Sequence, residues 1–181
     1  TKSGKKILFV ATKKQAKHVV AELVNETNMP YVTERWLGGM LTNFSTVKKS
    51  IRKMQAYDKM LADGTIDTMS KRERLQRSRQ REKLETVFGS ISDMNRTPAA
   101  IFIVDIKKEN IAFAEARKLG IPVFGMVDTN SNPKDVDFVI PSNDDASKSI
   151  SKVVGIMTEA IKEGLAERSA SKGKEKVAEK A

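Results

Sequence analysis

The apolar residues near the start of the chain form a short continuous run followed by a helical stripe. Residues 6–11 read K-I-L-F-V-A, and an apolar run of this length is typical of a strand buried on both faces of a parallel sheet. The stripe that follows has helical spacing, and its members are Ala16, Val19, Val20, Leu23 and Val24. Asn28-Met29-Pro30 ends this helix, and residues 31–33 are predicted to form a second strand.

The same alternation of strand and helix patterns returns in the last part of the chain. Strands are predicted at 99–106, 122–127 and 138–140, and helices over 110–119 and from about 143 to 165. Gly120 suits the left-handed cap that ends many helices. Strands that alternate with helices predict a parallel sheet covered on both faces. We therefore predict an α/β domain formed by residues 1–34 together with residues 95–165.

Residues 35–94 lack any strand pattern and carry two helical stripes instead. The first stripe consists of Phe44, Val47, Ile51, Met54 and Leu61, with Asp58 in the remaining seam position. Residues 62–65 interrupt it, and Ser70 then opens a capping box, S-x-x-E, at the start of a second helix. The second stripe consists of Leu75, Leu84, Val87, Phe88 and Ile91. The two stripes predict an antiparallel coiled-coil hairpin, inserted into the α/β domain.

A short segment, residues 35–44, joins the predicted sheet to the hairpin, and we call it the elbow. Its expected structural residues are Trp36, Gly38, Gly39, Thr42 and Asn43. Two adjacent glycines allow a sharp turn, and Thr42 or Asn43 is expected to cap the first hairpin helix. Trp36 and Leu37 are expected to anchor the elbow in the core.

The charge of the chain is concentrated in the predicted hairpin. The whole sequence has 33 Lys+Arg and 23 Asp+Glu, a net charge of +10. Residues 48–83 carry twelve basic and five acidic groups, a net +7, whereas residues 84–161 carry eight basic and eleven acidic groups, a net −3. An excess of Lys and Arg on one exposed element favours binding to the phosphates of a nucleic acid. Residues 166–181, rich in Lys, Glu, Ala and Ser, are expected to be a flexible charged tail.

We expect the nucleic-acid contacts to come from basic residues of the elbow and the hairpin. The candidates are Arg35, Lys48, Lys49, Arg52, Lys53, Lys71, Arg72, Arg74, Arg77, Arg79, Arg81 and Lys83. Arginine suits this role because its planar guanidinium can donate hydrogen bonds to two oxygens of one phosphate at the same time. A coiled-coil adaptor that binds an acidic protein is the alternative reading of the same charge.

Little in the sequence points to an enzyme. Neither the G-x-G-x-x-G nor the G-x-x-x-x-G-K-[ST] phosphate-binding pattern occurs, and the chain has no cysteine and one histidine, His18. We therefore expect no catalytic residues, no metal, no cofactor and no small-molecule substrate. Asp105 and Asp128, which end two predicted strands, leave one rival open: a Mg²⁺-dependent hydrolase or receiver-like domain. The other reading of these carboxylates is that they cap the turns that follow them.

Four blocks of sequence resemble the family of bacterial small-subunit ribosomal protein two. They are K-K-I-L-F-V-A-T-K at 5–13, R-W-L-G-G-M-L-T-N-F at 35–44, G-I-P-V-F-G-M-V-D-T-N-S-N-P at 120–133 and V-D-F-V-I-P-S-N-D-D-A at 136–146. The resemblance covers about residues 5–165. It implies a flavodoxin-like parallel sheet with an inserted coiled-coil hairpin.

The resemblance also implies a function and partners. A member of this family is a structural constituent of the small ribosomal subunit, in the cytoplasm, that takes part in translation. It binds 16S ribosomal RNA where the head of the subunit meets its body, lies among other small-subunit proteins and supports the docking of ribosomal protein one. No membrane is implied. Family members also carry an N-terminal segment with an H-F-G-H-type motif, so we expect further sequence upstream of Thr1.

Overall fold

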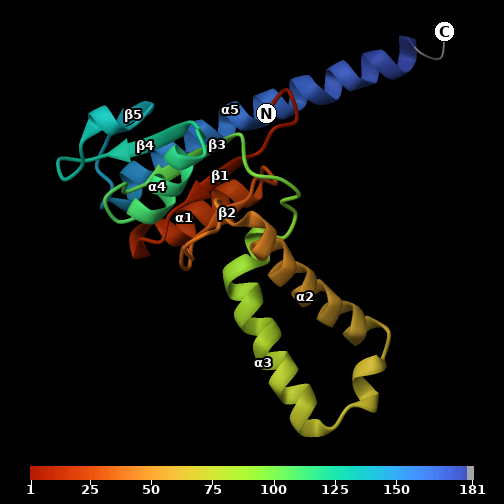
Figure 1. Cartoon of the computed structure of the whole chain (residues 1–181). Helices are drawn as coiled ribbons and strands as arrows, with labels where there is room; N and C mark the ends of the chain where they lie inside the picture. Colours follow the sequence, from red (N-terminus) through yellow and green to blue (C-terminus); the bar gives the residue numbers. More distant parts are fainter. Residues whose placement is uncertain (179–181) are drawn as a thin grey trace.

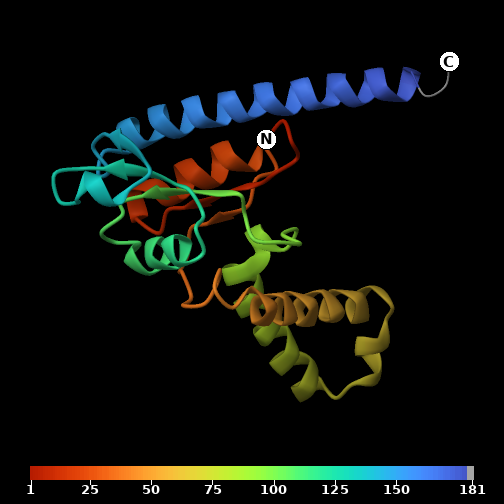
Figure 2. The same cartoon turned by 45° about the horizontal axis from the view of Figure 1, so that its top comes forward.

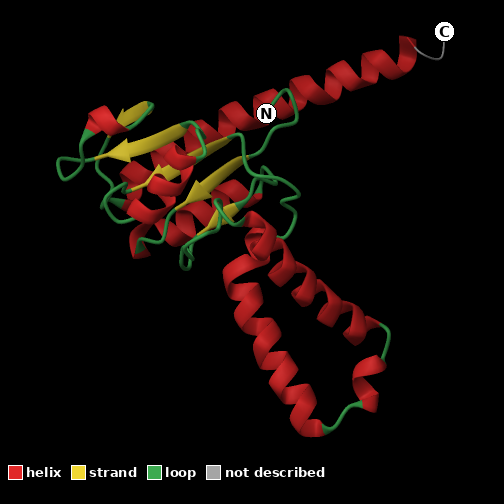
Figure 3. Ribbon diagram, viewed as in Figure 1, coloured by secondary structure: helices red, strands yellow, loops and turns green. Residues whose placement is uncertain are grey.

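The computed structural model describes the backbone of residues 1–178 and the surroundings of the side chains up to residue 171. Its centre is a five-stranded, all-parallel sheet in the order β2-β1-β3-β4-β5 (Figures 1 and 3). The strands are β1 (Ile7–Val10), β2 (Tyr31–Val32), β3 (Ala100–Val104), β4 (Val123–Val127) and β5 (Phe138–Pro141). This order is that of flavodoxin-like folds, so the predicted sheet is confirmed.

Successive side chains of the central strands enter two separate cores, as the twofold period of a strand requires. Leu8 and Ile101 face one core, and their neighbours Phe9 and Phe102 face the other. Helices α1 (Lys14–Asn25) and α5 (Ser147–Ala178) cover the face of Phe9, as Figure 2 shows above the sheet. Helix α4 (Asn110–Lys118), the elbow and the base of the hairpin cover the opposite face.

The hairpin consists of α2 (Phe44–Ala62), the short 3-10 helix η1 (Thr65–Thr68) and α3 (Lys71–Phe88), followed by η2 (Gly89–Ile91). The two long helices are closest beside the sheet and diverge toward the tip (Figures 1 and 2). Val47, Ile51 and Met54 are buried as expected. Leu61 and Leu75 are instead 48% and 53% exposed.

The apolar seam of the hairpin therefore ends earlier than the heptad pattern predicts. Tyr57, which lies outside the predicted stripe, is buried, and its hydroxyl donates to the carbonyl of Arg74 at 3.4 Å. Asp58 contacts Arg81 across the helices instead of packing in an apolar seam. Because the seam stops near Tyr57, the predicted coiled coil along the whole hairpin is not confirmed.

Helix α5 is longer than the sequence pattern indicates. Its apolar positions Ile150, Val154 and Ile161 pack on the sheet, and the helix then continues beyond the domain to Ala178 (Figure 1). Residues 166–178 of the expected tail are thus helical, which agrees with the high helix propensity of Ala, Lys, Glu and Arg. Residues 179–181 lie outside the described residues. Among the helices of residues 1–178, none combines the length with the apolar composition that a membrane-spanning segment requires.

Candidate nucleic-acid interface

The arginines of α3 divide into two sets that lie on opposite faces of the helix. Arg74, Arg77 and Arg81 fall on the face toward α2, where the helix is partly buried. Arg72 and Arg79 are seven residues apart, about two helical turns, so they share the other face, where both are exposed. Lys83, four residues after Arg79, continues this exposed face.

Carboxylates neutralise the set that faces α2. Arg74 binds Asp67 of η1 at 3.1 Å, and Arg77 binds Glu73 one turn earlier at 3.0 Å. Arg81 binds both Asp58 of α2 and Glu85 of its own helix. The hydrogen bond that Arg81 donates to the carboxylate of Asp58 is the main reason why the pKa of Arg81 is raised. Arg74 and Arg81 thus connect α3 to η1 and α2, and the paired charge of all three arginines leaves little net charge for a partner.

The exposed face of α3 carries uncompensated charge. Among the described residues, no carboxylate lies within the 4.0 Å ion-pair distance of Arg72, Arg79 or Lys83. Leu75, Gln76 and these three cations line a shallow hollow of about 590 Å³ along the helix. The geometry provides three cations, roughly in one row, whose donors are free to meet phosphate oxygens.

The remaining candidates lie on the elbow and at both ends of the hairpin. Those with exposed side chains are Arg35, Lys49, Arg52, Lys53 and Lys71. Lys48 is half-buried because its ammonium lies over the ring of Phe44, 5.4 Å from the centroid. Lys53 lines a groove of about 420 Å³ between the hairpin helices.

A buried carboxylate that the sequence analysis did not select organises the elbow. Glu115 of α4 is 8% exposed and lies more than 70 residues from the elbow in the sequence. Its Oε1 accepts hydrogen bonds from Trp36 Nε1 at 3.2 Å and from the Gly39 amide at 2.7 Å. Its Oε2 accepts from the amides of Leu41 and Thr42, at 2.9 and 3.0 Å, and from Thr42 Oγ1 at 3.1 Å. One side chain thereby fixes the direction in which the hairpin leaves the domain.

The electrostatics of Glu115 favour its ionised form. Burial alone would raise the pKa of this carboxyl, but the hydrogen bonds from the backbone amides of the elbow outweigh burial and lower the pKa below its ordinary value. A signal for this role exists in the sequence. Glu115 occupies the apolar side of its helix between Ala112 and Ala116, where an acidic residue needs a partner.

Two expectations about the elbow are corrected by these contacts. Neither Thr42 nor Asn43 caps α2 through its side chain, because Thr42 Oγ1 donates to Glu115 and Asn43 Oδ1 accepts from the hydroxyls of Ser45 and Thr46. Leu37 is 36% exposed, and Leu41 is the buried anchor beside Trp36. Of the two glycines, Gly39 is the one that the turn requires, since its φ is +91°.

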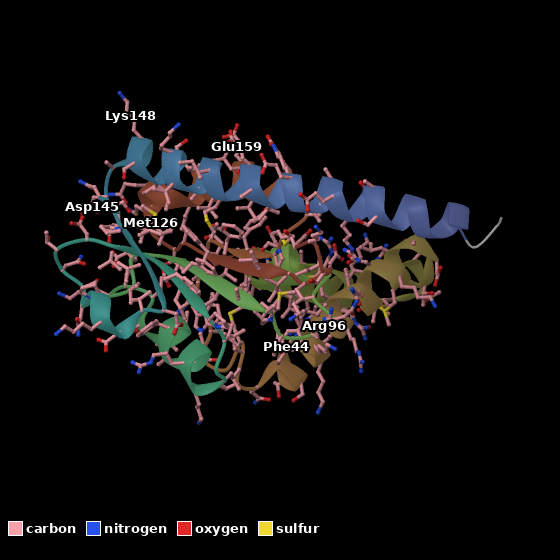
Figure 4. The ribbon with its side chains drawn as sticks, turned by 90° about the horizontal axis from the view of Figure 1, so that it is seen from above. Phe44, Arg96, Met126, Asp145, Lys148 and Glu159 are labelled. Carbon is pink, nitrogen blue, oxygen red and sulfur yellow. The ribbon has the colours of Figure 1, made fainter. Side chains whose placement is uncertain are left out.

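The carboxyl edge of the sheet, where ligands bind in folds of this type, is occupied by an ion-pair cluster. Lys13, after β1, binds Asp105 at 3.0 Å, Asp144 at 2.8 Å and Asp145 at 2.6 Å. Asp144 is almost fully buried, and burial raises its pKa. Asp145, labelled in Figure 4, lies at the opposite end of the domain from Arg96.

This cluster argues against the rival reading as a Mg²⁺-dependent enzyme. The ammonium of Lys13 lies where a metal ion between Asp105 and Asp144 would have to lie, and Asp128 is bonded to the amide of Thr129 in its own turn. The last helix, predicted from about residue 143, begins at Ser147, so Asp144 and Asp145 precede α5, and Asn143 Oδ1 accepts a hydrogen bond from the amide of Asp145. Among the described residues, no set of three or more Asp, Glu or His side chains could hold a metal.

Replacement of Lys13 by methionine should lower the free energy of unfolding by about 2 kcal/mol. Methionine leaves the buried carboxylate of Asp144 without its cation, and a buried unpaired charge costs several kcal/mol of stability. Protonation of Asp144 would remove the charge and so reduce this cost. Urea unfolding at pH 7 measures this change. Lys14→Met, at an exposed position next in the chain, removes the same charge and should change stability by less than about 0.5 kcal/mol. Equal effects of the two substitutions would remove the case for a structural role of the cluster.

Comparison with known proteins shows the family to which this chain is related. The family described as Ribosomal protein S2 matches residues 1–164, which is most of the chain. The chain belongs to the ribosomal protein S2 family. Proteins named small ribosomal subunit protein uS2 are 64% identical to it over 171 residues in Porphyromonas gingivalis and 63% identical over 170 residues in Flavobacterium johnsoniae. A third protein of that name, from Parabacteroides distasonis, is 61% identical over 180 residues.

These S2 relatives are longer than the chain. The Porphyromonas alignment covers 94% of the chain and 61% of the relative, and the Parabacteroides alignment covers 99% and 65%. The resemblance identified from the four sequence blocks is thus confirmed, and the family is a structural, non-enzymatic component of the ribosome. The S2 family match runs through the elbow, the hairpin and the ion-pair cluster described above.

Proposed function

We propose that this chain is part of a structural protein of the small ribosomal subunit that takes part in translation by binding 16S ribosomal RNA at the junction of head and body. The observation that carries the proposal is the row of uncompensated cations on the exposed face of α3. Membership of the S2 family supports the ribosomal setting. The chain acts by binding, and its residues perform no chemistry.

The contacts are mainly to phosphate and sugar, with little reading of base sequence. The row on α3 offers ammonium and guanidinium groups, which bind phosphate oxygens regardless of sequence. Trp36, the residue best suited to base stacking, is buried and bonded to Glu115. The elbow contributes one exposed cation, Arg35, next to the point where the hairpin begins.

Binding of the chain to 16S ribosomal RNA at increasing salt tests this proposal. If three to five phosphates are contacted, the observed association constant should fall by roughly 20- to 500-fold between ~50 mM and ~200 mM salt. Filter binding or co-sedimentation with small subunits measures the effect. Binding that does not respond to salt would contradict the assignment of the partner to RNA.

Support for the docking of ribosomal protein one is a second part of the proposal. The groove between α2 and α3 supports this part of the proposal, because Lys53, which has no carboxylate within 4.0 Å among the described residues, lines it together with the apolar side chains of Met54 and Leu84. Capture of ribosomal protein one that persists after nuclease treatment would support this role. Capture that disappears with the RNA would leave RNA binding as the whole function of the hairpin.

A further inference from the structure

A separate cationic hollow lies at the base of the hairpin, at the edge of the sheet where β1 and β3 begin. The amide of Ala99 donates to the carbonyl of Lys6 at 3.0 Å and joins the loop of residues 92–99 to the start of β1. Figures 1 and 2 show this loop between η2 and β3, beside the N-terminal segment. The hollow has a volume of about 360 Å³. We call it the root hollow; its polar lining comes from Lys5, Lys6, Asp93, Asn95, Arg96 and Thr97.

The side chains around the root hollow are mostly donors. Lys5, Lys6 and Arg96 face a single acidic residue, Asp93, whose backbone carbonyl accepts from Lys6 Nζ at 3.4 Å. Among the described residues, none of these three cations has a carboxylate within the 4.0 Å ion-pair distance. The guanidinium of Arg168 on α5 lies beside Gly4, another lining residue, since its Nη2 would lie 2.7 Å from a Cβ built on Gly4.

The charge of the root hollow contrasts with that of the domain around it. Residues 84–161 are net acidic, and the carboxylates at the opposite edge of the sheet are held by Lys13. The cations of this hollow form no ion pair with the described side chains, so they do not stabilise the fold by neutralising a carboxylate. Such an excess is what a bound anion would offset.

We propose that the root hollow binds a phosphate group of the RNA backbone, as a second contact separate from the row on α3. The inference rests on the proposed RNA-binding function. Helix α3 spans about 27 Å and ends at Phe88, and η2 then leads directly to the loop that carries Arg96. RNA that follows α3 toward the sheet therefore meets cations again at the root hollow. The amide of Asn95 and the hydroxyl of Thr97 add neutral donors for phosphate oxygens.

A pair of matched double variants of the full chain tests this site. Lys5→Gln with Arg96→Gln removes two cations of the root hollow. Lys148→Gln with Lys152→Gln removes two exposed cations from the start of α5, and Figure 4 shows Lys148 on the far side of the domain from Arg96. Filter binding to 16S ribosomal RNA at four salt concentrations gives the slope of log association constant against log salt. The thermal midpoint of each variant checks that its fold is unchanged.

The root-hollow variant should reduce the magnitude of this slope by about 0.7–0.9, which is the contribution of one lost phosphate contact. The α5 variant should leave the slope unchanged. The charge-preserving pair Lys5→Arg with Arg96→Lys should retain the slope of the original chain, which separates loss of charge from loss of fold. Equal slopes for the root-hollow and α5 variants would overturn the proposal.

The outcome also separates this site from the proposed function as a whole. If substitutions on α3 reduce the slope and those in the root hollow do not, RNA binding stands and the second contact fails. If the chain shows no salt-dependent RNA binding at all, both proposals fail. If the root-hollow variant loses capture of a ribosomal protein in nuclease-treated samples and keeps its RNA slope, the hollow binds protein and the phosphate assignment is wrong.

Discussion

Glu115→Ala is expected to lower the free energy of unfolding by about 4 kcal/mol, because it removes the acceptor of five hydrogen bonds from the elbow. The indole of Trp36 and the amide of Leu41 would be left buried without a partner, and each orphaned donor costs about 1–3 kcal/mol. Urea unfolding followed by circular dichroism measures the loss.

A second acidic residue provides the control for this substitution. Glu159 lies on the exposed side of α5, as Figure 4 shows, and Glu159→Ala should change stability by less than about 0.5 kcal/mol. A loss of stability after Glu115→Ala no larger than that of the control would mean that the elbow holds its conformation without this carboxylate. The contacts of Glu115 would then be a consequence of the fold and not one of its causes.

The same carboxylate should make the stability of the chain sensitive to acid. The pKa of Glu115 is lowered in the folded chain, so its stabilising effect is fully present above the ordinary glutamate pKa of 4.5 and is lost as the pH falls below that value. The difference in unfolding free energy between the original chain and Glu115→Gln should therefore shrink as the pH falls from about 5 to about 3. A difference independent of pH over this range would show that ionised Glu115 is not what the elbow binds.

Arg72→Gln combined with Arg79→Gln is expected to weaken binding to 16S ribosomal RNA about 30-fold at ~0.1 M salt and to reduce the salt slope by about 1.5. Both arginines lie on the exposed face of α3, and no carboxylate among the described residues offsets their charge. The loss should be similar for different RNA sequences, since phosphate contacts do not read bases.

The same helix supplies a control of equal charge and residue type. Arg74→Gln combined with Arg77→Gln removes two guanidinium groups that Asp67 and Glu73 already neutralise. This pair should weaken RNA binding much less than the exposed pair, at a small cost to the stability of the hairpin. If both double variants weaken binding equally, the two faces of α3 do not differ in function, and overall charge explains the binding.

The local pattern of the chain predicts the α/β domain well. The continuous runs at 6–11 and 99–106 become the buried strands β1 and β3, and the helical stripe after the first run becomes α1. Gly120 ends α4 at a φ of +64°, as its position predicts. These features depend on residues close together in the sequence, so periodicity and turn chemistry are enough to find them.

Charge counting locates the hairpin as the basic element but treats its twelve cations as equivalent. In three dimensions Arg74, Arg77 and Arg81 turn toward carboxylates, and only part of the charge remains available on the exposed face. The helical period of α3 could have separated the two faces, but which of them meets α2 depends on packing. The apolar seam predicted from heptads failed at Leu61 and Leu75 because the helices diverge before they reach the tip.

The sequence by itself determined the alternation of strands and helices, the insertion of a basic helical segment and the family to which the chain belongs. Only the tertiary structure decided which charges are paired. Glu115 meets the elbow, and Lys13 meets Asp105 and Asp144, across 73 to 131 residues of chain. A local pattern can show that a carboxylate such as Glu115 lies on the apolar side of its helix, but it carries no information about which distant residues become its partners. Its environment is set when distant elements pack together, and that environment determines its charge and its role.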